Sequence, residues 1–122
     1  MTPPDKTPSV ILKIRLLHKE LYTIGHKLSK RDKLGIHASV EKCCLELFSM
    51  VIAAAFTHRQ DKNKIVLLKT ARVRCEMLAN LMRTEHELGI IAEETYLHIS
   101  SQMVGIGKDL NGWITYQTQK KS

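Results

Sequence analysis

The sequence predicts an all-α protein, an antiparallel up-down-up-down four-helix bundle. Three observations lead to this fold class: two apolar seams that step alternately by three and four residues, one central segment that is apolar on two sides, and short polar connections. No stretch has the two-residue alternation of a strand. We expect a flexible leader at 1–7, the bundle at 8–116 and a frayed polar tail at 117–122.

Pro8 is predicted to lie at or just before the first turn of the first helix, since proline is tolerated there. Its apolar seam consists of Val10, Ile14, Leu17, Leu21, Ile24 and Leu28. The opposite side carries Arg15, Lys19, Tyr22 and His26. The sequence leaves two interpretations of this stripe open: a surface for phosphates and a stacked base, or an ordinary solvated face.

A basic connection follows the first helix. Ser29 and Asp32 have the spacing of a capping box, with an aspartate in the acidic place. The second helix can therefore start near Lys30 rather than after Gly35. Three cations cluster here, namely Lys30, Arg31 and Lys33. They fit an exposed turn, and at the end of a bundle they also fit a contact with a polyanion.

The second helix, centred on 40–56, is apolar on two sides. One face is formed by Val40, Cys43, Cys44, Leu47, Met50, Val51 and Ala54. The second face is formed by Leu45, Phe48, Ile52, Ala55 and Phe56. A surface helix of a monomeric bundle needs a broader polar side. We therefore expect the second face to meet either a further helix or a neighbouring subunit, with Leu45, Phe48, Ile52 and Phe56 as the oligomer interface.

The third helix follows a polar connection, 57–64, in which Asp61 is a candidate cap. Its buried positions are predicted to be Leu68, Ala71, Cys75, Leu78 and Met82. Its opposite face carries Lys69, Arg72, Glu76, Asn80 and Arg83. The three cations and the single acid Glu76 are consistent with a solvent-exposed surface that carries intrahelical ion pairs. They are equally consistent with a positively charged groove.

The fourth helix is predicted to start near Ala92 or Glu93, after Gly89 has ended the third. Its seam is Tyr96, Ile99, Met103, Ile106, Leu110 and Trp113. Glycines are poor helix formers, so those within the seam predict close contact with another helix. These glycines are Gly105, Gly107 and Gly112.

Composition narrows the class of protein. The formal net charge is +7, and residues 1–83 carry 16 Lys and Arg against 7 Asp and Glu. This excess favours a polyanionic partner, with simple solubility as the alternative. The longest apolar run is too short to cross a bilayer, and no signal peptide opens the chain, so we expect a cytoplasmic protein without a membrane. The three cysteines are expected to be buried hydrophobic residues.

The motifs of known catalytic chemistry are missing from the sequence. It has no Glu-x-x-His pair, no histidines at metal-ligand spacing, no nucleophile elbow and no phosphate loop. We therefore expect no enzymatic activity, no metal and no cofactor. A helix-turn-helix at 87–99 is disfavoured, because its recognition helix would begin with Glu93 and Glu94 facing phosphates.

Several blocks, spanning about 10–115, resemble a known family of small four-helix bundles. They are Leu28-Ser-Lys-Arg-Asp-Lys-Leu-Gly-Ile36, Val40-Glu41, Leu45-Glu-Leu47, Ile52-Ala-Ala-Ala-Phe56, Leu81-Met-Arg83, Glu87-Leu-Gly-Ile90 with Tyr96, and Ile106-Gly-Lys-Asp-Leu-Asn-Gly-Trp-Ile114. The family includes the accessory variability determinant (Avd) of diversity-generating retroelements and the intervening-sequence proteins encoded within large ribosomal RNA genes. The last block is the most specific, and the positive charge favours the Avd branch.

The resemblance implies a homopentameric barrel with a central channel and a basic surface. It also implies that a protein of the Avd branch is not an enzyme, and that it binds nucleic acid and the reverse transcriptase to support mutagenic cDNA synthesis. Arg83 matches a cationic position that Avd proteins use in these contacts, whereas Ala79 stands where a second cation is expected. Lys69 and Arg72 are candidates to compensate for it.

Two hypotheses follow from the sequence. In the first, the protein is an oligomeric scaffold that binds template RNA or cDNA and a reverse transcriptase. In the second, it is a structural or protein-interaction bundle of the ribosomal-RNA-encoded branch, and its charge serves only solvation. The gene next to it would separate them: a reverse transcriptase with a template repeat favours the first, and a ribosomal RNA operon favours the second.

Overall fold

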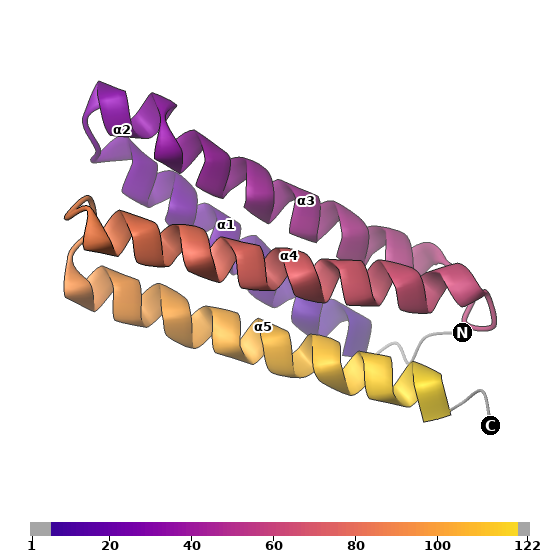
Figure 1. Ribbon diagram of the computed structural model, residues 1–122. Coiled ribbons are helices and arrows are strands. Elements are labelled where there is room, and N and C mark those ends of the chain that lie inside the picture. The colour runs from indigo at the N-terminus through magenta and orange to yellow at the C-terminus, as the bar shows by residue number, and fades with distance from the viewer. Residues whose placement is uncertain (1–5, 120–122) are drawn as a thin grey trace.

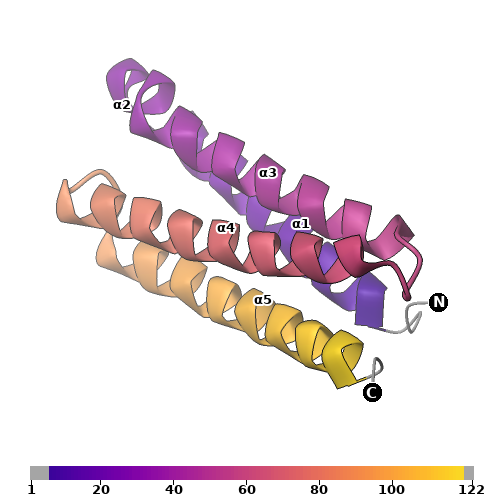
Figure 2. The same ribbon diagram turned by 45° about the vertical axis from the view of Figure 1, so that its right-hand side comes forward.

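The computed structural model describes residues 6–119 as five helices, four of them long (Figure 1). They are α1 (Lys6–His26), α2 (Lys30–Leu34), α3 (Ile36–Phe56), α4 (Lys62–Glu87) and α5 (Glu93–Gln119). Consecutive long helices run in opposite directions (Figures 1 and 2). α3 packs on α4, α4 on α5, and α1 on both α3 and α5, so the long helices enclose one core. The predicted four-helix architecture is confirmed.

Both apolar seams lie in this core. Val10, Ile14, Leu17 and Leu21 of α1 are buried, and they meet Ile99, Met103, Ile106, Leu110 and Trp113 of α5 in one cluster. α3 and α4 contribute the faces expected of them, including all three cysteines. Burying one such large side chain stabilises the fold by about 1.5–3 kcal/mol. Packing of these seams, rather than local helix propensity, therefore holds the helices together.

The helix ends follow the cap residues in the sequence. The Asp32 N–H donates to Oγ of Ser29 at 3.3 Å, and the Asn63 N–H donates to the Asp61 carboxylate at 2.9 Å. Gly89 has φ 74°, and the hydrogen bonds from Gly89 to His86 and from Ile90 to Glu85 form a Schellman motif. The predicted caps at Ser29 and Asp61 and the predicted stop at Gly89 are confirmed.

The helix predicted to run on from Lys30 is interrupted. α2 ends at Leu34, the Gly35 N–H donates to the Arg31 carbonyl, and α3 begins at Ile36. A β-carbon at Gly35 would lie 2.8 Å from that carbonyl oxygen. The break therefore depends on the one residue type that lacks this carbon.

The ends of the bundle differ from the expected boundaries. α1 begins at Lys6, inside the expected leader, and α5 continues to Gln119, past the expected end at 116. Gln117 is buried, and its Nε2 donates to the Arg59 carbonyl at 2.9 Å, so the expectation of fraying is wrong at this residue. The rest of the leader, 1–5, and of the tail, 120–122, lies outside the described residues.

The prediction of close helix contact at the α5 glycines is wrong for two of the three. A β-carbon at Gly105 or Gly112 would meet nothing within 4 Å. At Gly107 it would lie 3.6 Å from the Arg72 guanidinium, so the neighbour there is a side chain and not a helix backbone. Gly105 and Gly112 therefore lie where α5 has no close neighbour, and Gly107 lies on the side of α5 that faces α4.

Candidate nucleic-acid interface

The α4 cations predicted as a binding stripe fall into two environments. Arg72 is half-buried and faces α5, where its Nε donates to Oδ1 of Asn111 at 3.1 Å and its Nη1 lies 3.4 Å from Glu76. Lys69 is exposed. Arg83 is exposed as well, and its Nε lies 3.7 Å from a Glu87 oxygen. An exposed pair of this kind contributes little to stability, so Arg83 can exchange Glu87 for a phosphate at small cost.

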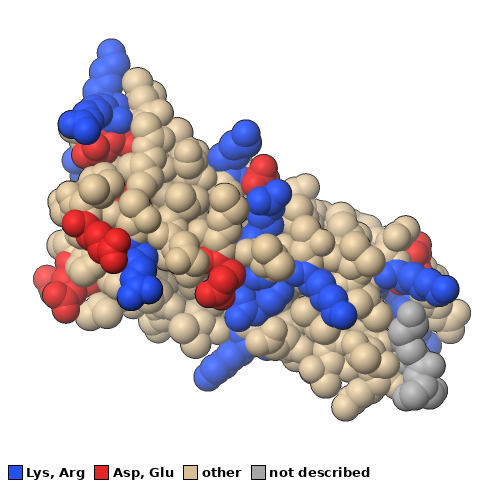
Figure 3. All heavy atoms as spheres, in the orientation of Figure 1, with Lys and Arg blue, Asp and Glu red and all other residues tan. Residues whose placement is uncertain are grey.

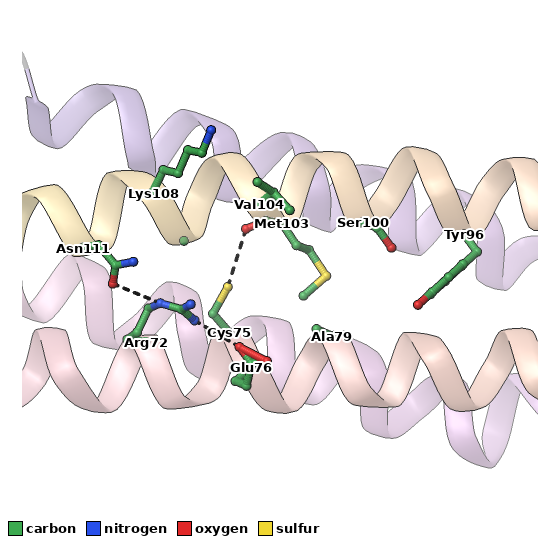
Figure 4. A pocket seen from close by; sticks show the side chains of 11 residues that line it. Arg72, Cys75, Glu76, Ala79, Tyr96, Ser100, Met103, Val104, Lys108 and Asn111 are labelled. Carbon is green, nitrogen blue, oxygen red and sulfur yellow. Dashed lines mark hydrogen bonds and ion pairs between the residues drawn. The ribbon is translucent and has the colours of Figure 1, made fainter.

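A groove of about 310 Å³ lies between α4 and α5, and we call it the α4–α5 groove. Its lining includes Arg72, Glu76 and Ala79 from α4 and Tyr96, Val104, Lys108 and Asn111 from α5 (Figure 4). Arg72 lies at one end and Tyr96 at the other, with Cys75, Met103, Ala79 and Ser100 between them (Figure 4). The structure thus brings Lys108 and Asn111, which the sequence interpretation did not assign to the site, next to predicted Arg72.

The α2 basic cluster, Lys30, Arg31 and Lys33, is exposed at the end of the bundle where α1 stops. Lys33 lines a hollow of about 230 Å³ together with Tyr22 and His26 of α1. The rings of Tyr22 and His26 meet edge to face, with centroids 5.1 Å apart. The fold therefore joins part of the α1 stripe to the α2 basic cluster.

Arg15 and Lys19 are exposed on α1, as expected for either interpretation of that stripe. On the side of α1 that faces α5, charges are paired between helices. Lys13 Nζ lies 2.9 Å from Asp109, and His98 Nε2 lies 2.9 Å from Glu20. The cations left for a partner on α1 are therefore those turned away from α5.

The predicted cations do not form one continuous patch. On the face shown in Figure 3, Lys and Arg gather in separate groups, and Asp and Glu gather at the end where α4 turns into α5. Acids at that end include Glu87, Glu93 and Glu94. The α2 basic cluster and Arg83 lie at this same end, so a polyanion that follows the basic groups would cross the middle of the bundle and pass beside these acids.

The second apolar face of α3 is exposed in the single chain. Phe56 is 88% exposed and Leu45 is 49% exposed, whereas Phe48 and Ile52 are partly buried. A second exposed apolar stripe, which the sequence interpretation missed, runs along α4 and consists of Val66, Val73 and Met77. Its spacing of seven and four residues is a helical seam and was the available signal.

Nothing in the described residues suggests a redox or metal centre. Burial raises the pKa of the Cys44 thiol to about 12, and burial likewise raises the pKa of Cys43 and of Cys75. Thiols of this kind are unreactive. Within 6–119, no three His, Cys, Asp or Glu side chains are grouped so that they could hold a metal ion. No helix in the same range is long and apolar enough to cross a membrane.

A comparison with known protein families identifies the family of this chain. The model of the bAvd-like family, the bacterial Avd-like proteins, matches residues 10–117. The chain belongs to the bAvd-like family. Members are generally non-catalytic, and membership suggests an accessory protein of the Avd type associated with a diversity-generating retroelement. No significant match to a curated protein or to a solved structure was found.

The most specific sequence block of this bAvd-like chain is 106–114. Some of its residues lie in the core, and others line the α4–α5 groove. Leu110 and Trp113 are buried, and the Trp113 ring lies 5.4 Å from Nζ of Lys64, a cation–π distance. Lys64 is itself buried, donates to the Thr57 carbonyl at 3.0 Å, and has its pKa lowered by burial. Gly107 accommodates Arg72, and Lys108 lines the α4–α5 groove.

Proposed function

We propose that this bAvd-like protein is a non-enzymatic accessory protein of a diversity-generating retroelement. In this proposal it is a basic oligomeric scaffold that binds template RNA or cDNA and the reverse transcriptase during mutagenic reverse transcription. The observation that carries the proposal is the family match over 10–117 in a chain whose net charge is +7.

Nucleic acid binds through cations on the outer faces of three helices. Lys69, Arg72 and Arg83 contribute from α4, Lys30, Arg31 and Lys33 from α2, and Arg15 and Lys19 from α1. Each phosphate contact releases counterions, so binding of this kind weakens steeply as salt rises. The separate basic groups favour a strand that contacts several of them in turn over one compact anion site.

The exposed apolar stripes of α3 and α4 support assembly into a ring. They lie on different helices, so a contact between the α3 stripe of one copy and the α4 stripe of the next is heterologous. Heterologous contacts close into a ring when the rotation between copies allows it. A pentamer carries about +35 formal charges, five times the charge of one chain, and modest contacts per subunit then sum to useful affinity.

The nucleic-acid part is tested by reversing charge on α4. Lys69→Glu with Arg83→Glu should weaken binding of a labelled single-stranded RNA by about tenfold at low salt and flatten its salt dependence. The matched control is Lys27→Glu with Lys42→Glu, which changes the net charge equally at exposed positions outside the proposed interface. Equal loss in both double variants would show that net charge alone matters and would remove the α4 stripe from the interface.

The partner part is tested by co-purification. The protein should copurify with the reverse transcriptase of its retroelement and with the template RNA, and nuclease treatment separates contact with protein from contact through RNA. A protein that retains neither partner at low salt would contradict the scaffold.

A further inference from the structure

We propose that the α4–α5 groove binds one unstacked nucleobase of a single strand, while Arg72 binds the adjacent phosphate. This inference rests on the proposed function, because it assumes that a single-stranded nucleic acid is the ligand. It adds a contact to the base itself, which a surface of dispersed cations does not supply.

The size and floor of the α4–α5 groove fit a flat ring. Its volume of about 310 Å³ is at the lower end of the range for small-molecule pockets, about 300–1,000 Å³. Small residues on both helices leave room for it, namely Ala79 on α4 and Ser100 and Gly107 on α5, and the Cys75 and Met103 side chains lie between them. Val104 adds an apolar surface at the side, where it is exposed in the single chain.

The aromatic ring of Tyr96 closes one end of the α4–α5 groove. Tyr96 stacks on His86 with ring centroids 4.6 Å apart and planes 5° from parallel. His86 follows Ala79 by about two turns of α4, so it covers the face of Tyr96 that points away from Arg72. The Tyr96 ring, seen nearly edge-on in Figure 4, therefore turns its other face toward the groove. Single-strand-binding proteins stack bases on such rings.

At the other end of the groove, the Arg72 guanidinium is held in a fixed orientation. Asn111 and Glu76 hold Arg72, and the guanidinium lies against Gly107 with carbon and nitrogen atoms 3.6–3.8 Å from the β-carbon position. A guanidinium that is already oriented loses little freedom when it binds a phosphate. Lys108 lines the rim of the groove and is exposed, and its side chain extends away from Arg72 in Figure 4. The groove thus offers an aromatic face and a phosphate site at opposite ends.

Glu76 disfavours an isolated phosphate in this groove. Its carboxylate is 65% exposed and shares the Arg72 guanidinium, so it partly cancels the positive charge. A neutral base between Glu76 and the apolar wall avoids this repulsion, and an N–H of the base, such as the ring N–H of thymine, can donate to the carboxylate. The groove accordingly suits a nucleotide within a strand better than a simple anion.

The test compares two labelled oligonucleotides of equal length and charge, a 12-mer of oligo-dT and the same backbone without bases. Fluorescence anisotropy with the intact protein should give about tenfold tighter binding of oligo-dT, the scale of one or two stacked bases. Tyr96→Leu should remove this preference, and Tyr96→Phe should keep it. Ala79→Leu, which fills the groove without changing charge, should also remove it.

Controls separate the groove from the remaining surface. Tyr116→Leu removes an aromatic ring on α5 outside the α4–α5 groove and should leave the preference unchanged, and thermal melting by circular dichroism shows that each variant remains folded. Equal, salt-sensitive binding of both oligonucleotides would overturn the base site and leave the proposed function standing. A preference that persists in Tyr96→Leu and Ala79→Leu would also overturn it, and binding of neither oligonucleotide would overturn both proposals.

Discussion

Nδ1 of His37 lies 2.8 Å from Oε2 of Glu85, and both side chains are completely buried. Nε2 of His37 lies 2.7 Å from the Leu21 carbonyl oxygen, which can only accept, so Nε2 carries a proton. His37 begins α3, Glu85 ends α4 and Leu21 belongs to α1. One imidazole therefore ties three helices together at the end of the bundle that carries α2.

Stability should fall as pH rises above neutrality. Burial opposes protonation of His37, but the hydrogen bonds to Glu85 and Leu21 and the charges of Glu85 and Glu41 outweigh it and raise the pKa of His37 above 6.5. A raised folded-state pKa gives stability that is complete below about pH 6.5 and is lost as pH passes through the folded value. Each unit of the raised pKa corresponds to about 1.4 kcal/mol. Urea midpoints between pH 6 and 8, below the range in which unfolded cysteines ionise, measure the loss, and His37→Gln should abolish the slope; an unchanged slope would contradict the assignment.

Removing one member of the pair should cost more than removing both. His37→Leu leaves the Glu85 carboxylate buried without its partner, and Oε1 already has none within 6–119, so we expect a loss of about 3–5 kcal/mol. The double variant His37→Leu with Glu85→Leu should recover most of the loss. A double-mutant cycle of urea unfolding measures the coupling, and additive losses would show that the two residues act independently.

Glycine replacements should have opposite signs at two places. Gly112→Ala puts a β-carbon in open space within α5 and should stabilise the protein by about 0.5–1 kcal/mol. Gly35→Ala puts a β-carbon 2.8 Å from the Arg31 carbonyl oxygen and should destabilise it. Thermal melting of the two variants gives the comparison; stabilisation by Gly35→Ala would mean that the α2–α3 break can relax.

The apolar face of α3 should control assembly. Leu45→Glu with Phe56→Glu introduces charge at side chains exposed in the single chain, so the fold should survive while the oligomer dissociates. Leu97→Glu on α5 is the matched control, because Leu97 is also exposed and apolar but lies outside this face. Sedimentation velocity measures the mass of each variant. If only the Leu97→Glu control dissociates, the interface lies on α5.

The sequence predicted what depends on neighbours along the chain. The seams of α1 and α5, the caps at Ser29 and Asp61 and the stop at Gly89 rest on contacts within a few residues, and periodicity and side-chain chemistry reveal them. The two-sided apolarity of 40–56 was visible for the same reason. Counting polar positions around this helix predicted that its second face needs an apolar partner, and Leu45 and Phe56 of that face are exposed in the single chain.

Pairs between distant helices were beyond such reasoning. His37 and Glu85 are 48 residues apart, and Arg72 and Asn111 are 39 apart, so no local pattern marks either pair. The sequence left open whether Arg72 lies on a wet surface or in a positive groove, and its partner Asn111 on α5 decides for a groove. The α5 glycines were misinterpreted because a lack of side chains allows close approach without requiring it.

The central claim is that copies of this small bundle assemble and pool their cations for nucleic acid. Sedimentation velocity of the purified chain at micromolar concentration, with a labelled single-stranded RNA at low and high salt, tests it most directly. We predict that the RNA cosediments with a multi-subunit species at low salt and is released at high salt, while the protein mass is unchanged. A protein that sediments as a single chain, or RNA that never joins the protein, would contradict the claim.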